Sequence, residues 1–116
     1  MNVAILGFGT VGSGVADMLT QNKARLSERA GQPVELKYIL DIREFPSSPY
    51  KDLFVNDFSV IEQDETVDVV AEVIGGVGKA YEFTKRALLS GKSVVSSNKE
   101  LVATHGPELL ALAEEK

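Results

Sequence analysis

The chain has 116 residues, 44% of them apolar and 25% charged, which suits a single globular domain with one core. It has no cysteine and one histidine, so disulfides and thiolate metal sites are excluded and an imidazole-rich metal site is disfavoured. Its net charge of −5, with no basic stripe, argues against a nucleic-acid partner, and no apolar run approaches the about 20 residues of a membrane span, so we expect a cytoplasmic protein without metal or membrane contacts.

The first third of the chain predicts a strand, a long helix and a second strand. Residues 2–6 are a short apolar run that ends at glycine, which is typical of a buried strand. Apolar residues then recur at helical spacing, and they predict one helix that begins near Val11 and runs to about Ala30, where Gly31 ends it. Apolar alternation over residues 34–41 predicts the second strand.

The middle of the chain is less regular. Two prolines and two serines in a row after Phe45 predict a loop over residues 42–52. A short strand is expected over residues 54–58, and a short acidic helix, with its charges in solvent, over residues 60–65.

The last part returns to alternating strands and helices. Residues 67–74, rich in valine, predict a strand buried on both faces, as in a parallel sheet covered by helices. A helix over residues 80–88, closed by Gly91, a strand over residues 93–97 and a helix after Pro107 follow. Repeated strand–helix units predict a single α/β domain with a doubly wound parallel sheet. The final helix shows no capping signal, so we expect the chain to be part of a longer protein.

A glycine-rich loop lies between the first strand and the first helix. Gly7, Phe8, Gly9, Thr10, Val11 and Gly12 match the pattern G-x-G-x-x-G. In this position the first glycine permits the tight turn, the second lets a pyrophosphate approach the backbone, and the third lets the helix pack closely on the strand. Free amides at the helix start then face the phosphates. The loop therefore predicts a Rossmann-type site for a dinucleotide, NAD or NADP.

The choice between these two cofactors depends on the end of the second strand. Asp41 lies there, 29 residues past Gly12 rather than the usual about 20, an extension that the long first helix explains. Its carboxylate would bind the ribose hydroxyls and favour NAD. Arg43 could instead bind a 2′-phosphate and favour NADP, or could be an ordinary solvated charge, so the sequence leaves the preference open.

Two further strand ends carry candidate site residues. The strand over residues 67–74 ends at Gly75 and Gly76, and the strand over residues 93–97 is followed by Asn98 and Lys99. Ligands of open α/β sheets bind outside the carboxyl ends of the strands, so these ends should meet the glycine loop in one crevice. A lysine there can orient a carbonyl, bind a carboxylate or transfer a proton, although a surface lysine at a strand exit is also common.

These motifs together resemble a known family. Residues 7–15, 72–76 and 91–101 are similar to the N-terminal nucleotide-binding domain of homoserine dehydrogenase, and the strand followed by Asn98 and Lys99 is the most specific part. The resemblance covers essentially all 116 residues. It implies an oxidoreductase that interconverts L-homoserine and L-aspartate 4-semialdehyde with NAD(P), on the route to threonine, methionine and isoleucine.

The resemblance also implies roles for individual residues. The glycine loop through Val11 would hold the pyrophosphate, and Lys99 would be the active-site lysine of this domain. The nicotinamide side would be bordered by Gly75, Gly76, Ser96, Ser97 and Asn98. A substrate-binding and dimerisation domain is expected beyond Lys116 in a homodimeric or homotetrameric parent, so residues 1–116 alone should bind dinucleotide without catalysis.

Other interpretations stay open from the residues themselves. A non-catalytic NAD(H)-sensing module would share the glycine loop but would not need Lys99. Another dehydrogenase, such as an aspartate-semialdehyde or dihydrodipicolinate-type reductase, would share the nucleotide domain. The single histidine, His105, precedes a Gly-Pro pair and is interpreted as a structural turn residue, since no catalytic partner is visible.

Overall fold

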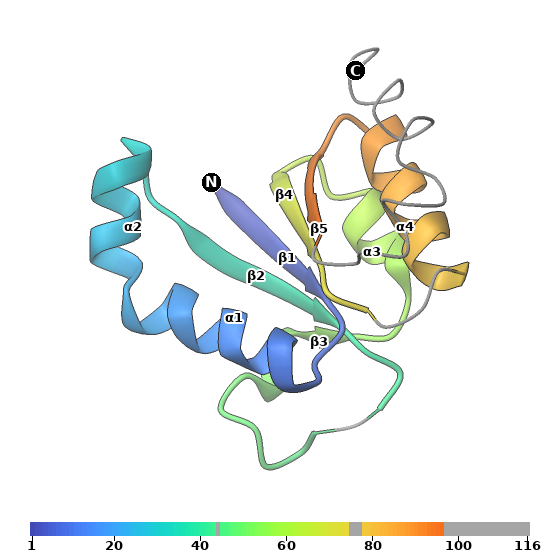
Figure 1. Cartoon of the computed structure of the whole chain (residues 1–116), viewed down its shortest axis with the longest axis horizontal. Coiled ribbons are helices and arrows are strands. Elements are labelled where there is room, and N and C mark those ends of the chain that lie inside the picture. The colour runs from blue at the N-terminus through green and yellow to red at the C-terminus, as the bar shows by residue number, and fades with distance from the viewer. Residues whose placement is uncertain (44, 75–77, 97–116) are drawn as a thin grey trace.

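The chain forms a five-stranded parallel sheet with helices on both faces (Figure 1). The computed structural model describes residues 1–43, 45–74 and 78–96. The strands are β1 (Asn2–Leu6), β2 (Glu35–Leu40), β3 (Phe54–Val55), β4 (Val67–Glu72) and β5 (Ser93–Ser96). Their order across the sheet is β3-β2-β1-β4-β5. The chain adds β2 and β3 on one side of β1 and then β4 and β5 on the other, so the order of the strands switches at β1. The predicted doubly wound parallel sheet is confirmed.

The helices divide between the two faces of this sheet. Figure 1 shows α1 (Thr10–Gln21) and α2 (Lys23–Ala30) on one side, and α3 (Phe58–Glu62) and α4 (Gly78–Leu89) on the other. A single 3₁₀ turn, η1 (Lys51–Leu53), precedes β3. Successive residues of β1 therefore enter different cores: Ile5 packs with Ala16 of α1, whereas Leu6 packs with Phe58 of α3. Burial on both faces explains why β1 is apolar from Val3 to Leu6.

The long helix expected from Val11 to about Ala30 is interrupted. Asn22 has φ −109° and ψ 21°, so it ends α1 and begins α2. Asparagine is a weak helix former because its side chain competes for backbone hydrogen bonds, whereas the apolar spacing on either side continues and predicts one helix. Gly31 ends α2 in the left-handed conformation, φ 73°, as predicted.

The segment before β4 also differs from the sequence-based expectation. The strand expected over residues 54–58 has two residues, and Phe58 instead begins α3. The Asp57 carboxylate accepts a hydrogen bond from Ser59 N at 2.9 Å, so it caps the helix. This capping aspartate was the sequence signal for an earlier helix start. The strand expected over residues 67–74 ends at Glu72.

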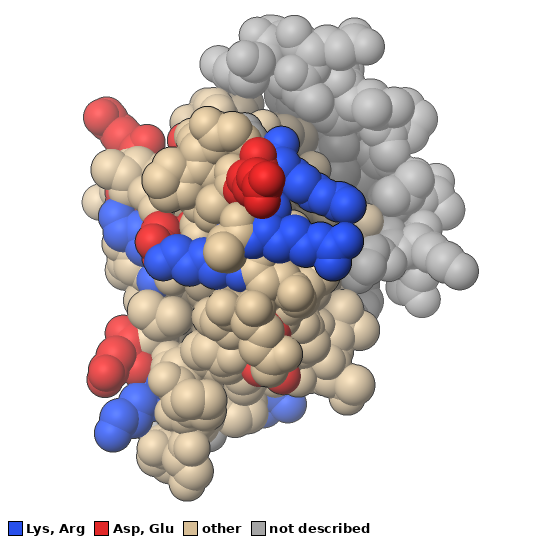
Figure 2. Space-filling model, turned by 90° about the vertical axis from the view of Figure 1, so that its left-hand side faces the viewer, with Lys and Arg blue, Asp and Glu red and all other residues tan. Residues whose placement is uncertain are grey.

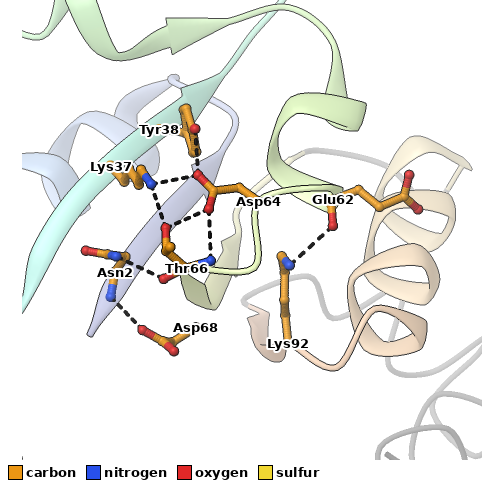
Figure 3. A network of polar contacts seen from close by, with 8 residues as sticks. All are labelled: Asn2, Lys37, Tyr38, Glu62, Asp64, Thr66, Asp68 and Lys92. Atoms are coloured by element: carbon orange, nitrogen blue, oxygen red, sulfur yellow. Dashed lines mark hydrogen bonds and ion pairs between the residues drawn. The ribbon is translucent and has the colours of Figure 1, made fainter.

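Two acidic residues in this segment, Glu62 and Asp64, are paired with other side chains, so the expectation of a solvated helix face was wrong for them, whereas Glu65 is exposed. The Asp64 carboxylate accepts hydrogen bonds from Lys37 Nζ and Tyr38 OH of β2, both at 2.7 Å, and from Thr66 Oγ1 at 2.6 Å (Figure 3). These donors hold the pKa of Asp64 well below its usual range. The neighbouring Glu62 forms an ion pair with Arg86 at 2.8 Å. The network therefore joins the start of β4 to β2, at the end of the sheet opposite the glycine loop.

Candidate functional site

The three glycines of the loop after β1 meet three different requirements. Gly7 has φ +97°, which side chains rarely adopt. A Cβ on Gly12 would lie 1.9 Å from the carbonyl oxygen of Gly7, so α1 could not pack here with any other residue. A Cβ on Gly9 would meet nothing within 4 Å, and Gly9 has φ −85°, so this position is open toward the outside. The tight turn predicted at Gly7 and the close helix packing predicted at Gly12 are confirmed, and their contact with a cofactor stays a prediction.

The start of α1 presents backbone amides that have no side-chain cap and no recorded acceptor among the residues that the structure describes. Gly9 is the residue before the helix and provides no capping side chain. The first bond within the helix runs from Ser13 N to Gly9 O at 2.9 Å, which places the amides of Thr10, Val11 and Gly12 ahead of it. The first turn carries no acidic side chain. Together with the helix dipole, this arrangement suits a bound phosphate.

Phe8 anchors the loop by its ring and its backbone. The ring makes edge contacts with Phe45 and Phe54, at centroid distances of 5.0 and 4.9 Å, and with Tyr50 at 6.2 Å. Its amide donates to Asp41 Oδ2 at 2.9 Å. The loop is thus fixed to the end of β2 and to the segment that precedes β3. This contact brings the two predicted parts of the cofactor site together.

Asp41 and Arg43 form an ion pair at the end of β2. Oδ1 of Asp41 accepts from Arg43 N and Nε at 2.9 and 3.1 Å, while Oδ2 accepts from Phe8 N and Arg43 Nη2, both at 2.9 Å. These hydrogen bonds, those from the Arg43 side chain first, lower the pKa of Asp41 from 3.8 to about 2. The Asp41 side chain is 6% exposed and that of Arg43 is 60% exposed. The Arg43 side chain therefore stays accessible to a ligand while it is paired with Asp41.

A cavity of about 440 Å³ runs along these residues. Its lining includes Gly7 and Gly9 of the loop, Asp41 and Arg43 after β2, and Lys79 of α4. A second cavity of about 540 Å³ shares Arg43 and includes Lys51. Lysines 51 and 79 were not singled out by the sequence, because exposed lysines carry no positional signal until the fold places them beside a cavity.

The exits of β4 and β5 lie beside the glycine loop. Val73 N donates to Leu6 O at 3.0 Å, which joins the residue after β4 to the end of β1. Ser96 of β5 donates its hydroxyl to the buried carboxylate of Glu72 at 2.6 Å. Sequence reasoning missed Glu72 as a site residue, although an acidic residue at the end of a valine-rich strand was a visible signal.

Several predicted residues lie outside the described residues. These are Gly75, Gly76, Ser97, Asn98, Lys99 and His105, together with the helix expected after Pro107. Their roles stay predictions.

On the face of the molecule that Figure 2 shows, basic side chains gather across the upper half. Acidic side chains lie between and beside the basic ones on this face. Within the part of the chain that the structure describes, no group of three or more His, Cys, Asp or Glu side chains is placed to hold a metal ion. No helix in that part is long and apolar enough to cross a membrane.

The parallel sheet, the glycine turn and the open start of α1 define a Rossmann-type dinucleotide-binding domain. The model of one family, described as homoserine dehydrogenase, NAD binding domain, matches residues 7–116. The chain belongs to this family, as its sequence motifs led us to expect.

Relatives and solved structures agree with this assignment. The chain is 35% identical to homoserine dehydrogenase of Lactococcus lactis, over 98% of this chain and 28% of the relative, and 40% identical to that of Corynebacterium glutamicum, over 98% and 26%. A crystal structure of S. aureus homoserine dehydrogenase superposes with a TM-score of 0.87 at 32% identity, over 99% of this chain and 30% of that one. The chain thus spans less than a third of these relatives.

Proposed function

We propose that residues 1–116 form the cofactor-binding domain of an enzyme that interconverts L-homoserine and L-aspartate 4-semialdehyde. The observation that carries this proposal is the glycine loop of a homoserine dehydrogenase NAD-binding domain, opening on a cavity of about 440 Å³ that extends to Asp41. When bound, the nicotinamide supplies or accepts the hydride. Homoserine binding and contacts between subunits come from other parts of a longer, homodimeric or homotetrameric protein.

The chain's own contribution to pyrophosphate binding is made by backbone donors. The amides of Thr10 and Val11 lie in an exposed first turn, and the open position at Gly9 lets a phosphate approach them. No basic side chain is needed for this contact, which agrees with the acidic character of the chain. Phe8 attaches the loop to Asp41, Phe45 and Phe54. Its role in this proposal is to fix the backbone amides in position rather than to contact the cofactor.

The ion pair at the end of β2 favours NADP over NAD. A carboxylate has about four lone-pair positions, and Asp41 already accepts four hydrogen bonds, so none is left for the ribose hydroxyls. Its charge, which would repel a 2′-phosphate, is compensated by Arg43. The exposed guanidinium and Lys51 line the same cavity and together suit an anionic group. NADPH is the cofactor bound in a solved hyperthermophilic archaeal homoserine dehydrogenase, 24% identical to this chain with a TM-score of 0.75.

The nicotinamide lies toward the exits of β4 and β5 in this proposal. Both strands leave the sheet at the edge where β1 ends, and the family resemblance assigns Gly75, Gly76, Ser96, Ser97 and Asn98 to this side. Lys99 would hold or move a proton at the substrate oxygen, the task for which a lysine in a cleft is suited.

Two measurements test the proposal. Calorimetric titration of the 116-residue chain should show NADP binding, tighter than NAD binding. A longer protein that contains this domain should form NADPH only when homoserine is added. Failure to bind either dinucleotide would refute the site, whereas binding without homoserine-dependent turnover in the longer protein would favour a sensing role.

A further inference from the structure

Glu72, the last residue of β4, has a fully buried side chain with 0% exposure. Removing a carboxylate from water is costly unless hydrogen bonds replace its hydration. Both oxygens of Glu72 have such bonds: Oε1 accepts from Ile74 N at 3.0 Å, and Oε2 accepts from Ser96 Oγ at 2.6 Å. No lysine or arginine among the described residues forms an ion pair with it. The carboxylate is therefore held by these two groups.

The two donors belong to different strand exits. Ile74 lies two residues beyond Glu72, in the backbone that leaves β4, and Ser96 is the last residue of β5. Glu72 and Ser96 are register partners in the parallel pair, so their side chains meet at the last rung of the sheet. The Glu72 side chain thus links the end of β4, which precedes Gly75, to the end of β5, which precedes Ser97.

Ile74 in turn contacts the glycine loop. A Cβ on Gly7 would lie 3.2 Å from Ile74 Cγ1 and 3.3 Å from the carbonyl oxygen of Val73, so the β4 exit packs directly against the loop turn. Ile74 also lines the cavity of about 440 Å³. A shift of the β4 exit would therefore change the shape of the crevice at this end. The start of α1 is held separately, because Phe8 donates to Asp41 and packs against Phe54.

We propose that Glu72 is a positioning residue that fixes the exits of β4 and β5 and so sets the geometry of the nicotinamide end of the crevice. The inference rests on the proposed function, because that proposal places the nicotinamide beside these exits. Glu72 acts through Ile74 and Ser96 and touches neither substrate nor cofactor. A carboxyl group suits this task because each of its two oxygens can accept from a different strand exit.

The test compares NADP with ADP-ribose 2′-phosphate, which has the same phosphates and ribose but no nicotinamide. Amide spectra of the 116-residue chain, recorded by NMR with each ligand at saturation, locate the nicotinamide by difference, and calorimetry gives the two affinities. Three variants are compared. Glu72→Ala removes the hydrogen bonds to Ile74 and Ser96, and Ser96→Ala removes the second of them. Glu72→Gln retains an acceptor for Ile74 and can donate to the Ser96 hydroxyl. Glu62→Gln is the matched control, a paired carboxylate at the opposite end of the sheet.

In the unsubstituted chain we expect NADP-specific shifts at Ile74 and Ser96. Glu72→Ala and Ser96→Ala should lose them and weaken NADP binding about tenfold or more, the scale of a lost hydrogen bond to a charged group, with ADP-ribose 2′-phosphate affinity within about twofold of the original. Glu72→Gln and Glu62→Gln should retain the shifts and the affinity.

Three results would overturn the inference, and they differ from failure of the proposed function. Equal losses for both ligands, with the spectrum of a folded chain, would mean a general structural role for Glu72. A Glu72→Gln variant as weak as Glu72→Ala would mean that the charge matters rather than the two hydrogen bonds. Unchanged NADP binding in Ser96→Ala and both Glu72 variants would exclude any role. If the unsubstituted chain shows no NADP-specific shifts at the two exits, the nicotinamide placement itself is wrong.

Discussion

The guanidinium of Arg43 forms a bidentate ion pair with the carboxylate of Asp41: Nε donates to Oδ1 at 3.1 Å, and Nη2 donates to Oδ2 at 2.9 Å. The residue expected to reject a 2′-phosphate is thus neutralised by the residue expected to bind one. The sequence presented these two residues as conflicting signals. Their pairing is the basis of the proposed preference for NADP, because the carboxylate is occupied and the guanidinium remains 60% exposed.

The Arg43→Ala variant should lose NADP affinity selectively. We expect a loss of about 1.5–3 kcal/mol, the value of a hydrogen bond to a charged group, since the 2′-phosphate loses its partner. NAD affinity should stay the same or rise slightly, because Asp41 regains free lone pairs for the ribose. Calorimetry with both dinucleotides measures this, with Lys79→Ala as a comparison at another basic residue that lines the same cavity. Equal losses for NAD and NADP would show that Arg43 acts on the fold instead.

Substitutions at Gly9 and Gly12 should separate binding from folding. In Gly9→Val the side chain enters open space at negative φ, so the free energy of unfolding should change by less than about 0.5 kcal/mol while dinucleotide binding is lost. In Gly12→Ala the new methyl group meets the Gly7 carbonyl oxygen, so stability should fall by about 1–3 kcal/mol. Urea unfolding and NADP titration of both variants measure the two effects. Unchanged affinity in Gly9→Val would remove the glycine loop from the site.

The Asp41 carboxyl should contribute to stability in a defined pH range. Its pKa is lowered from 3.8 to about 2 in the folded chain, so its stabilisation is fully present above pH 3.8 and is lost as the pH falls toward 2. The contribution at neutral pH is at most about 2 kcal/mol, reduced by solvent screening because Arg43 is exposed. Urea unfolding of the unsubstituted chain and of Asp41→Asn should differ at pH 7 and pH 5 and converge near pH 2. A difference that persists unchanged at pH 2 would contradict this account.

Asp64 provides a control for that experiment. The pKa of Asp64 is also lowered, first by its hydrogen bond from Lys37, so Asp64→Asn should lose stability with the same sign of pH dependence. Because Asp64 lies at the amino end of the sheet, away from the cavity, its variant should bind NADP normally. A fall in NADP affinity for Asp64→Asn would mean that the two ends of the sheet are coupled.

Lys99 should matter for turnover more than for cofactor binding. In a longer protein that carries this domain and a homoserine-binding part, Lys99→Ala should lower kcat by about 10²–10⁴-fold, the range of general acid–base catalysis, with little change in NADP affinity. Lys99→Arg keeps the positive charge but cannot release its proton, so it should also be slow if proton transfer is the task. Steady-state kinetics with homoserine measure this effect. Normal turnover of Lys99→Ala, or homoserine oxidation by residues 1–116 alone, would refute the assignment.

The sequence by itself determined the fold class and the place of the cofactor loop. Strand and helix periods are local, and Gly7 and Gly12 stand where a tight turn and a close helix–strand approach demand glycine, so both could be predicted from neighbouring residues. The break at Asn22 and the cap at Asp57 are also local, and the sequence-based boundaries were wrong there because apolar spacing outweighed these weaker signals.

Only the tertiary structure decided which polar groups meet. The bond from Phe8 to Asp41 spans 33 positions in the chain, and those from Asp64 to Tyr38 and from Glu72 to Ser96 span 26 and 24. Such contacts depend on the order of strands across the sheet, which no local pattern records. They make Asp64, expected in a solvated segment, an acceptor for two side chains of β2, and they make Asp41, expected to bind ribose, the partner of an arginine. Charge can be read from composition, but whether a charge is free or paired depends on residues that the fold brings to it.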